Sequence, residues 1–163
     1  MLATTTAETP DDSMNLSGPL DGWLAANAPL LGAFLQPPIP PGFSGGESSA
    51  PMLWNHTPPT PLAPIERHHF GFNTCNGCHS LETSTPFLHV GVRAFGSPAP
   101  LSPFLSTPTG GGGGGFPTSA LVVADPAGTG ASFQYNEPWR RLCEASRMLK
   151  GAPQCWSRAN GAH

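Results

Sequence analysis

Residues 75–79 read Cys-Asn-Gly-Cys-His, a single C-x-x-C-H motif whose residue types and spacing are typical of a c-type haem attachment site. The thiols of Cys75 and Cys78 can each add across a haem vinyl group, which fixes the porphyrin by two thioether bonds. The imidazole of His79 follows the second thiol directly, where it can coordinate the iron as the proximal axial ligand. The motif therefore predicts a c-type monohaem electron-transfer domain, because haem supplies the redox chemistry and the chain sets its potential and access.

Two other uses of the same residues stay open. Cys75, Cys78 and His79 could hold zinc or a disulfide in a non-enzymatic interaction module. The remaining cysteines, Cys143 and Cys155, are expected to form a disulfide if the chain is exported, and would favour zinc if it is cytoplasmic. Thioredoxin-like chemistry is disfavoured because no β-α-β pattern surrounds the motif. No acid–base pair or nucleophile stands out, so the sequence does not indicate an enzyme.

A haem also needs partners for its iron and its propionates. His89 is a candidate distal ligand because it lies in the apolar run 87–90, and Met148 is a second candidate on the expected last helix. Arg67 and Arg93 are the expected propionate partners, since a guanidinium pairs with a carboxylate through two hydrogen bonds. Further candidates near the iron are Met52, His56, His68 and His69.

Two helices are expected before and around the motif. Residues 20–35 carry an apolar stripe behind a possible N-cap at Asp21, with a break near Asn27 because Pro29 lies inside the pattern. Residues 65–72 predict a short helix or turn that leads into the motif, where Asn73 or Thr74 could cap the next turn. Gly77 is expected to let the backbone approach the porphyrin closely.

The elements after the motif are shorter, apart from the last. Residues 85–105 read as irregular or short extended pieces that could line a pocket, and 120–124 as a short strand ending in Asp-Pro. The clearest helix runs from about residue 136 to 150, with Asn136 as its cap, and is expected to pack on the helix that bears the motif.

Composition limits the fold class. Pro and Gly number 21 and 20 of 163 residues. Leu, Ile, Val and Phe together make up only about a fifth of the chain, which is close to the boundary with disordered sequences. We therefore expect a mainly α, small cytochrome-c-like helical domain with much irregular loop and Pro/Gly-rich flanks. The expected segments are a disordered or truncated start (1–19), a helix with a Pro-rich connector (20–64), the haem-binding domain (65–155) with a Gly-rich tether (110–115), and a tail (156–163).

Charge and hydropathy limit the partners. Lys and Arg number only seven and the net charge is −3, which argues against a nucleic-acid partner and leaves a redox protein as the expected one. No apolar run approaches a membrane span. Residues 1–16 lack the basic start and apolar core of a secretory signal. Because c-type haem is normally attached outside the cytoplasm, we expect a periplasmic or secreted protein whose natural start is missing from this sequence.

A longer stretch also resembles a known group of sequences. Residues 67–79, with Glu82-Thr83, the Phe-Leu-His-Val of 87–90 and Arg93, are similar to the carboxyl-terminal region of uncharacterised secreted proteins of myxobacterial type. The resemblance covers roughly residues 64–150 and includes 124–126, 133–136 and 140–141. It implies an exported protein longer than this chain and strengthens interest in His89, but it supplies no activity. The motif alone resembles the cytochrome c superfamily, without its Met-bearing loop, which leaves the sixth ligand open.

Overall fold

The elements of the chain follow one another from a short 3-10 helix to a β-hairpin. The computed structural model describes residues 8–44, 47, 49, 52–77, 81–85, 90–91, 93–106, 121–136, 138, 145–146 and 148–149. Within these residues lie two 3-10 helices, η1 (Asp12–Met14) and η2 (Pro41–Phe43), three α-helices, α1 (Gly18–Gly32), α2 (Pro64–Phe72) and α3 (Pro103–Ser106), and two strands, β1 (Leu121–Ala124) and β2 (Ser132–Tyr135).

Helix α1 begins earlier than the sequence suggested. Its N-cap is Ser17, whose hydroxyl accepts a hydrogen bond from the N–H of Leu20, so the predicted cap at Asp21 was wrong. Asp21 lies inside the first turn, where its carboxylate accepts from the N–H of Thr57. The helix also continues through Pro29 instead of breaking near Asn27.

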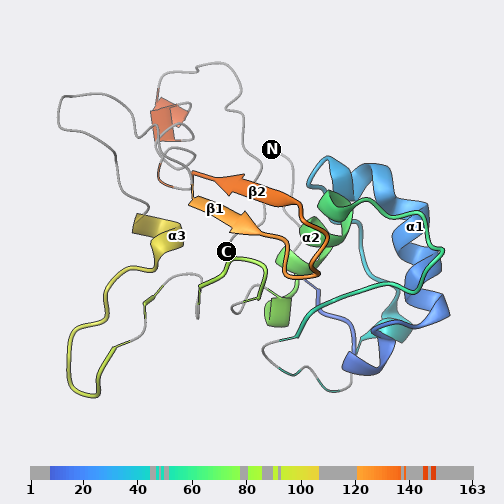
Figure 1. Cartoon of the computed structure of the whole chain (residues 1–163), viewed down its shortest axis with the longest axis horizontal. Helices are drawn as coiled ribbons and strands as arrows, with labels where there is room; N and C mark the ends of the chain where they lie inside the picture. Colours follow the sequence, from blue (N-terminus) through green and yellow to red (C-terminus); the bar gives the residue numbers. More distant parts are fainter. Residues whose placement is uncertain are drawn as a thin grey trace.

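Helix α2 lies between α1 and the β-hairpin (Figure 1). On the α1 side it contributes Phe70 to a group of buried apolar side chains that we call the Trp54 cluster. This group joins residues from both sides of the boundary expected at residue 64, so the two segments share one core. The Trp54 cluster consists of Leu20, Leu24, Leu31, Ile39, Trp54 and Phe70.

On its other side α2 packs against the hairpin. Strands β1 and β2 are antiparallel, with Leu121 opposite Tyr135 and Ala124 opposite Ser132. Val123 from β1 and alternate residues of β2 point inward, as expected for a ribbon with one buried face. The second group of buried side chains, which we call the Phe72 cluster, consists of Phe34, Phe72, Phe104, Val123, Phe133 and Tyr135.

The fold class was predicted in part. The structure is small and contains helices, but a two-stranded sheet supplies half of one apolar cluster, so the chain is not plainly mainly α. The strand expected at 120–124 is present as β1, whereas β2 was not anticipated. The expected helix over 136–150 and the Gly-rich tether lie wholly or largely outside the described residues.

Residues 8–19 are held to the segment after α1 by hydrogen bonds. Over residues 8–19, the N–H of Asp11 donates to the carbonyl of Phe43 at 2.7 Å, and the Glu8 carboxylate accepts from the N–H of Ile39 at 2.7 Å. These contacts bind the start of the chain to the segment after α1. Within the described part of the chain, no helix has the length and apolar character that a membrane crossing requires.

Candidate functional site

The first residue of the C-x-x-C-H motif lies at the surface directly after α2. Cys75 carries a free, exposed thiol. Its backbone N–H donates to the hydroxyl of Thr9 at 2.7 Å, which fixes the start of the motif to the amino-terminal segment. The thiol is thus accessible while the backbone that carries it is held.

The second residue of the motif faces the opposite way. Asn76 is buried, and its Oδ1 accepts from the indole N–H of Trp54 at 2.7 Å. Its Nδ2 donates to Asp12 Oδ1 at 3.2 Å and lies 3.4 Å from the sulfur of Met52. Asn76 therefore anchors the motif to the Trp54 cluster, and the Met52 sulfur lies on this buried side, whereas the Cys75 thiol is exposed.

Gly77 packs against the last turn of α2. A Cβ at this position would lie 2.2 Å from the carbonyl oxygen of Gly71, so only glycine fits without a shift of the backbone. The hydroxyl of Thr74 completes the turn, since it donates to the carbonyl of Gly71 at 2.6 Å and accepts from the N–H of Gly77 at 3.2 Å. Thr74, one of the two candidate caps, thus caps this turn, and the backbone of Gly71 is a close neighbour of Gly77.

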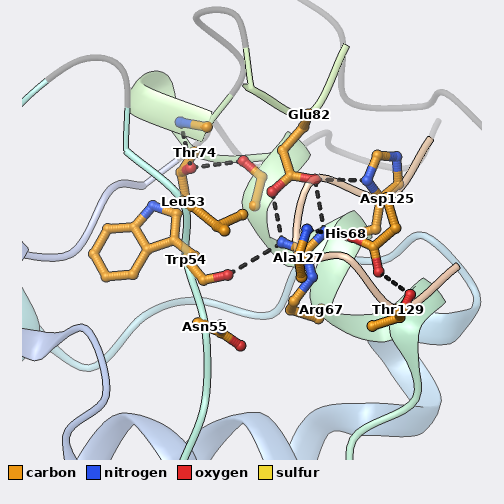
Figure 2. A network of polar contacts seen from close by, with 12 residues as sticks. Leu53, Trp54, Asn55, Arg67, His68, Thr74, Glu82, Asp125, Ala127 and Thr129 are labelled. Atoms are coloured by element: carbon orange, nitrogen blue, oxygen red, sulfur yellow. Dashed lines mark hydrogen bonds and ion pairs between the residues drawn. The ribbon is translucent and has the colours of Figure 1, made fainter. Parts of the chain in front are cut away.

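A buried polar network connects α2 to the chain after the motif and to the hairpin. We call it the Arg67 cluster, and it consists of Arg67, His68, Glu82, Asp125 and Tyr135. Arg67 is 1% exposed, and three parts of the chain converge on its guanidinium (Figure 2). Nη1 donates to the carbonyl of Trp54 at 3.1 Å and to Glu82 Oε1 at 2.6 Å, and Nη2 donates to Glu82 Oε2 at 2.9 Å and to Asp125 Oδ1 at 2.7 Å. The pair with Glu82 is therefore bidentate, the strongest arrangement for these groups.

His68 extends the Arg67 cluster toward the hairpin. Its Nδ1 lies 2.6 Å from Glu82 Oε2, and its Nε2 is hydrogen-bonded to the hydroxyl of Tyr135. Because an ionised carboxylate can only accept, Nδ1 of His68 carries a proton. The ring stacks on Phe133 with 3.7 Å between centroids and an interplanar angle of 10°.

Asp125 ties the hairpin loop into the Arg67 cluster. Its carboxylate accepts from the hydroxyl of Thr129 and from the N–H of Ala127 at 3.0 Å, besides Arg67. Burial disfavours the charged form, but these hydrogen bonds and the charge of Arg67 outweigh burial and lower the pKa of Asp125 from its ordinary value of 3.8. In the same way burial opposes the charge of Arg67, yet Glu82 and Asp125 raise the pKa of its guanidinium overall.

The two expected propionate partners lie in different surroundings. Arg67 was expected to bind a propionate, but its two terminal nitrogens are already bound by Glu82, Asp125 and the Trp54 carbonyl. Arg93 remains on the surface, where its Nη1 donates to the carbonyl of Ser97 at 2.5 Å. Arg93 is therefore the one of the two arginines that lies exposed.

The candidate iron ligands are scattered or undescribed. Met148 is 78% exposed, and the neighbouring Leu149 is 84% exposed. His69 is buried with its Nδ1 2.7 Å from the carbonyl of Leu31, and His56 is half-buried. The residues expected to matter that lie outside the described part of the chain are Cys78, His79, His89, Cys143 and Cys155.

Sequence reasoning missed three members of the Arg67 cluster, which are Glu82, Asp125 and Tyr135. They lie 15, 58 and 67 residues from their partners in α2, so no local pattern links them. One hint was present in the sequence, since Arg67 and His68 lie in the same short predicted helix as two aromatic residues, Phe70 and Phe72.

Of the motif, the structure describes residues 75–77, and the exposed Cys75 among them fits covalent haem attachment. The Cys75 thiol is accessible to a vinyl group, and the next two residues are turned inward and bound to protein. Among the described residues, no group of three His, Cys, Asp or Glu side chains is placed to hold a metal ion. No protein-family model, curated protein or solved structure matches the sequence.

Proposed function

We propose that this chain is a c-type monohaem electron-transfer domain, with haem held covalently by Cys75 and Cys78 and with His79 as the proximal ligand. The observation that carries the proposal is the C-x-x-C-H spacing of residues 75–79, with its first thiol exposed on an anchored backbone. When bound, haem supplies a one-electron couple of the iron. The finer fold assignment, a cytochrome-c-like domain, belongs to the same proposal, as do a redox-protein partner and a periplasmic or secreted location.

The surroundings of Cys75 support a site that presents this thiol outward. Cys75 is exposed, whereas Asn76 and Gly77 are buried and packed on the Trp54 side chain and on Gly71. In this arrangement Asn76 and Gly77 hold the backbone of the motif against the protein, while the side chain of Cys75 stays exposed. Arg93 is the exposed guanidinium that could pair with a propionate.

The test is expression in a host with periplasmic haem-attachment machinery, behind an added secretion signal. We expect a coloured protein whose haem stays attached on a denaturing gel. The Cys75→Ala/Cys78→Ala pair should lose all covalent haem, while the matched Cys143→Ala/Cys155→Ala pair should keep it. A colourless, iron-free product would overturn the proposal, and stoichiometric zinc without iron would instead favour the zinc-stabilised module that the same residues allow.

A further inference from the structure

We infer that Glu82 is the positioning residue of the C-x-x-C-H motif: its carboxylate ties the chain after the motif to Arg67 and His68 before it, and supports the backbone on which the motif rests. The inference rests on the proposed function only for its effect on haem. Its structural part, that Glu82 holds this segment in place, stands on the contacts of the described residues.

The first argument is that Glu82 connects the chain after the motif to the helix before it. Glu82 binds Arg67 through two hydrogen bonds and approaches His68 at 2.6 Å, which joins residues 15 and 14 positions apart. The backbone N–H of Glu82 also donates to the carbonyl of Gly77 at 3.1 Å. Glu82 therefore contacts α2 through its side chain and the middle of the motif, Gly77, through its backbone.

The second argument is a succession of close contacts from the carboxylate to the motif. A Cβ on Gly71 would lie 2.5 Å from Glu82 Oε1, and a Cβ on Gly77 would lie 2.2 Å from the carbonyl oxygen of Gly71. Glu82, Gly71 and Gly77 thus pack directly on one another with no space for an added methyl group. A displaced carboxylate would leave the backbone under the motif without its support.

The third argument separates Glu82 from the other acidic member of the Arg67 cluster. Asp125 binds the same guanidinium at 2.7 Å, but its remaining contacts are within the hairpin loop, to Ala127 and Thr129. Glu82→Gln and Asp125→Asn therefore remove one buried carboxylate charge each from Arg67, and only the first acts at the motif. The two variants form a matched pair.

Hydrogen exchange of the full chain, resolved by peptide, tests the structural part without haem. In Glu82→Gln, exchange of residues 70–85 should rise about tenfold or more relative to α1, because buried donors lose a charged acceptor. In Asp125→Asn the larger rise should fall on residues 121–136. An equal rise in all peptides of Glu82→Gln, or wild-type rates over 70–85, would overturn the inference. If circular dichroism shows that Glu82→Gln is unfolded, Glu82→Asp is used in its place. Its carboxylate is shorter by one methylene group, and the same increase in exchange over residues 70–85 is expected.

Haem content provides the second readout. Per folded chain, Glu82→Gln should carry less covalent haem than Asp125→Asn, and the haem that it carries should show a shifted reduction potential. Equal content and equal potential in the two variants would overturn the positioning role. A wild-type chain without haem would overturn the proposed function alone, since the exchange experiment would still decide whether Glu82 holds the segment.

Discussion

Arg67 is the residue through which separate parts of this chain are joined. It binds a carbonyl before α2, a carboxylate after the motif and a carboxylate in the hairpin loop. Removal of one partner of such a buried pair leaves the other charge uncompensated, which typically costs about 3–5 kcal/mol. A charged side chain that the sequence assigned to a haem propionate is thus a central part of the interior.

The lowered pKa of Asp125 leads to a prediction about acid stability. A carboxyl group whose pKa is lower in the folded state than in the unfolded state stabilises the fold above its unfolded pKa, near 3.8, and loses that contribution as the pH falls through the lower folded value. Wild-type protein should therefore lose more free energy of unfolding between pH 5 and pH 2 than Asp125→Asn. Urea unfolding at several pH values measures both.

The control for this prediction is Glu47→Gln, which removes a carboxylate from the surface. Its loss of stability with acid should follow that of the wild type. A difference between wild type and Asp125→Asn that stays constant from pH 6 to pH 2 would contradict the assignment of this acid sensitivity to Asp125.

How far the sequence predicts single residues depends on the distance between partners. Thr74 could be named as one of two candidate caps because its partner, Gly77, lies three residues away. Arg67 was assigned to a propionate because nothing in its neighbourhood points to Asp125, 58 residues later. Local rules find caps and turns, whereas a buried ion pair becomes visible only when the chain is folded.

At the scale of elements, α1 shows why a local break signal can fail. Pro29 removes one hydrogen bond within the helix, which normally favours a kink or an end. The helix nevertheless continues, with buried Leu24 before the proline and buried Leu31 after it in the same Trp54 cluster. Burial of side chains on both sides of Pro29 favours a continuous helix and can offset the lost hydrogen bond.

In the hairpin, the local sequence pattern was sufficient to predict strand β1 but not strand β2. The run of apolar residues in β1 indicated a strand and its end at Asp125. β2 consists of Ser-Phe-Gln-Tyr, which alternates polar and aromatic residues but is only four residues long. An alternation this short does not distinguish a strand from a loop until its partner strand is known.

The contact between the motif and α2 predicts a strong effect of a single methyl group. Gly77→Ala should lower the free energy of unfolding by more than about 1 kcal/mol, because its Cβ would overlap the carbonyl oxygen of Gly71. Gly22→Ala in α1 is the matched control, since no atom lies within 4 Å of its added Cβ. It should be neutral or stabilise the protein by up to about 1 kcal/mol, because alanine favours the helix.

Thermal or urea unfolding compares the two glycine variants directly. Equal stability of Gly77→Ala and the wild type would show that the motif does not pack on α2 as described. A destabilised Gly22→Ala would mean that Gly22 does not lie at an open, exposed position of α1 as described.

At the scale of the whole molecule, α2 joins the two apolar clusters. Phe70 belongs to the Trp54 cluster and Phe72 to the Phe72 cluster, and only two positions separate them in the chain. A chain with few large apolar residues thus builds two small groups around one nine-residue helix. The composition predicted that few large apolar residues would be available for a core. It did not indicate that charged side chains such as Arg67, Glu82 and Asp125 would also be buried.

Because both clusters depend on α2, the described core should unfold as one unit. Phe72→Ala removes a ring that is 2% exposed and should cost about 3–5 kcal/mol. Tryptophan fluorescence, in a background where Trp139 and Trp156 are replaced by Phe, then reports on the other cluster through Trp23 and Trp54. Its urea midpoint should fall together with that of far-UV circular dichroism.

A fluorescence midpoint that stays at the wild-type value while circular dichroism shifts would contradict this cooperativity. It would mean that the Trp54 cluster is stable without the hairpin. The conservative variant Phe72→Leu extends the test if Phe72→Ala is unfolded in water, since the two midpoints should again move together.

The order of the Arg67 cluster along the chain has a consequence for synthesis. Arg67, His68, the motif and Glu82 leave the ribosome first, and Asp125 and Tyr135 follow only after the intervening residues have been made. At about 5–20 residues per second, this delay lasts several seconds. During that interval α2 and the motif exist without their partners in the hairpin, so the Arg67 cluster can be completed only after residue 135 has been made.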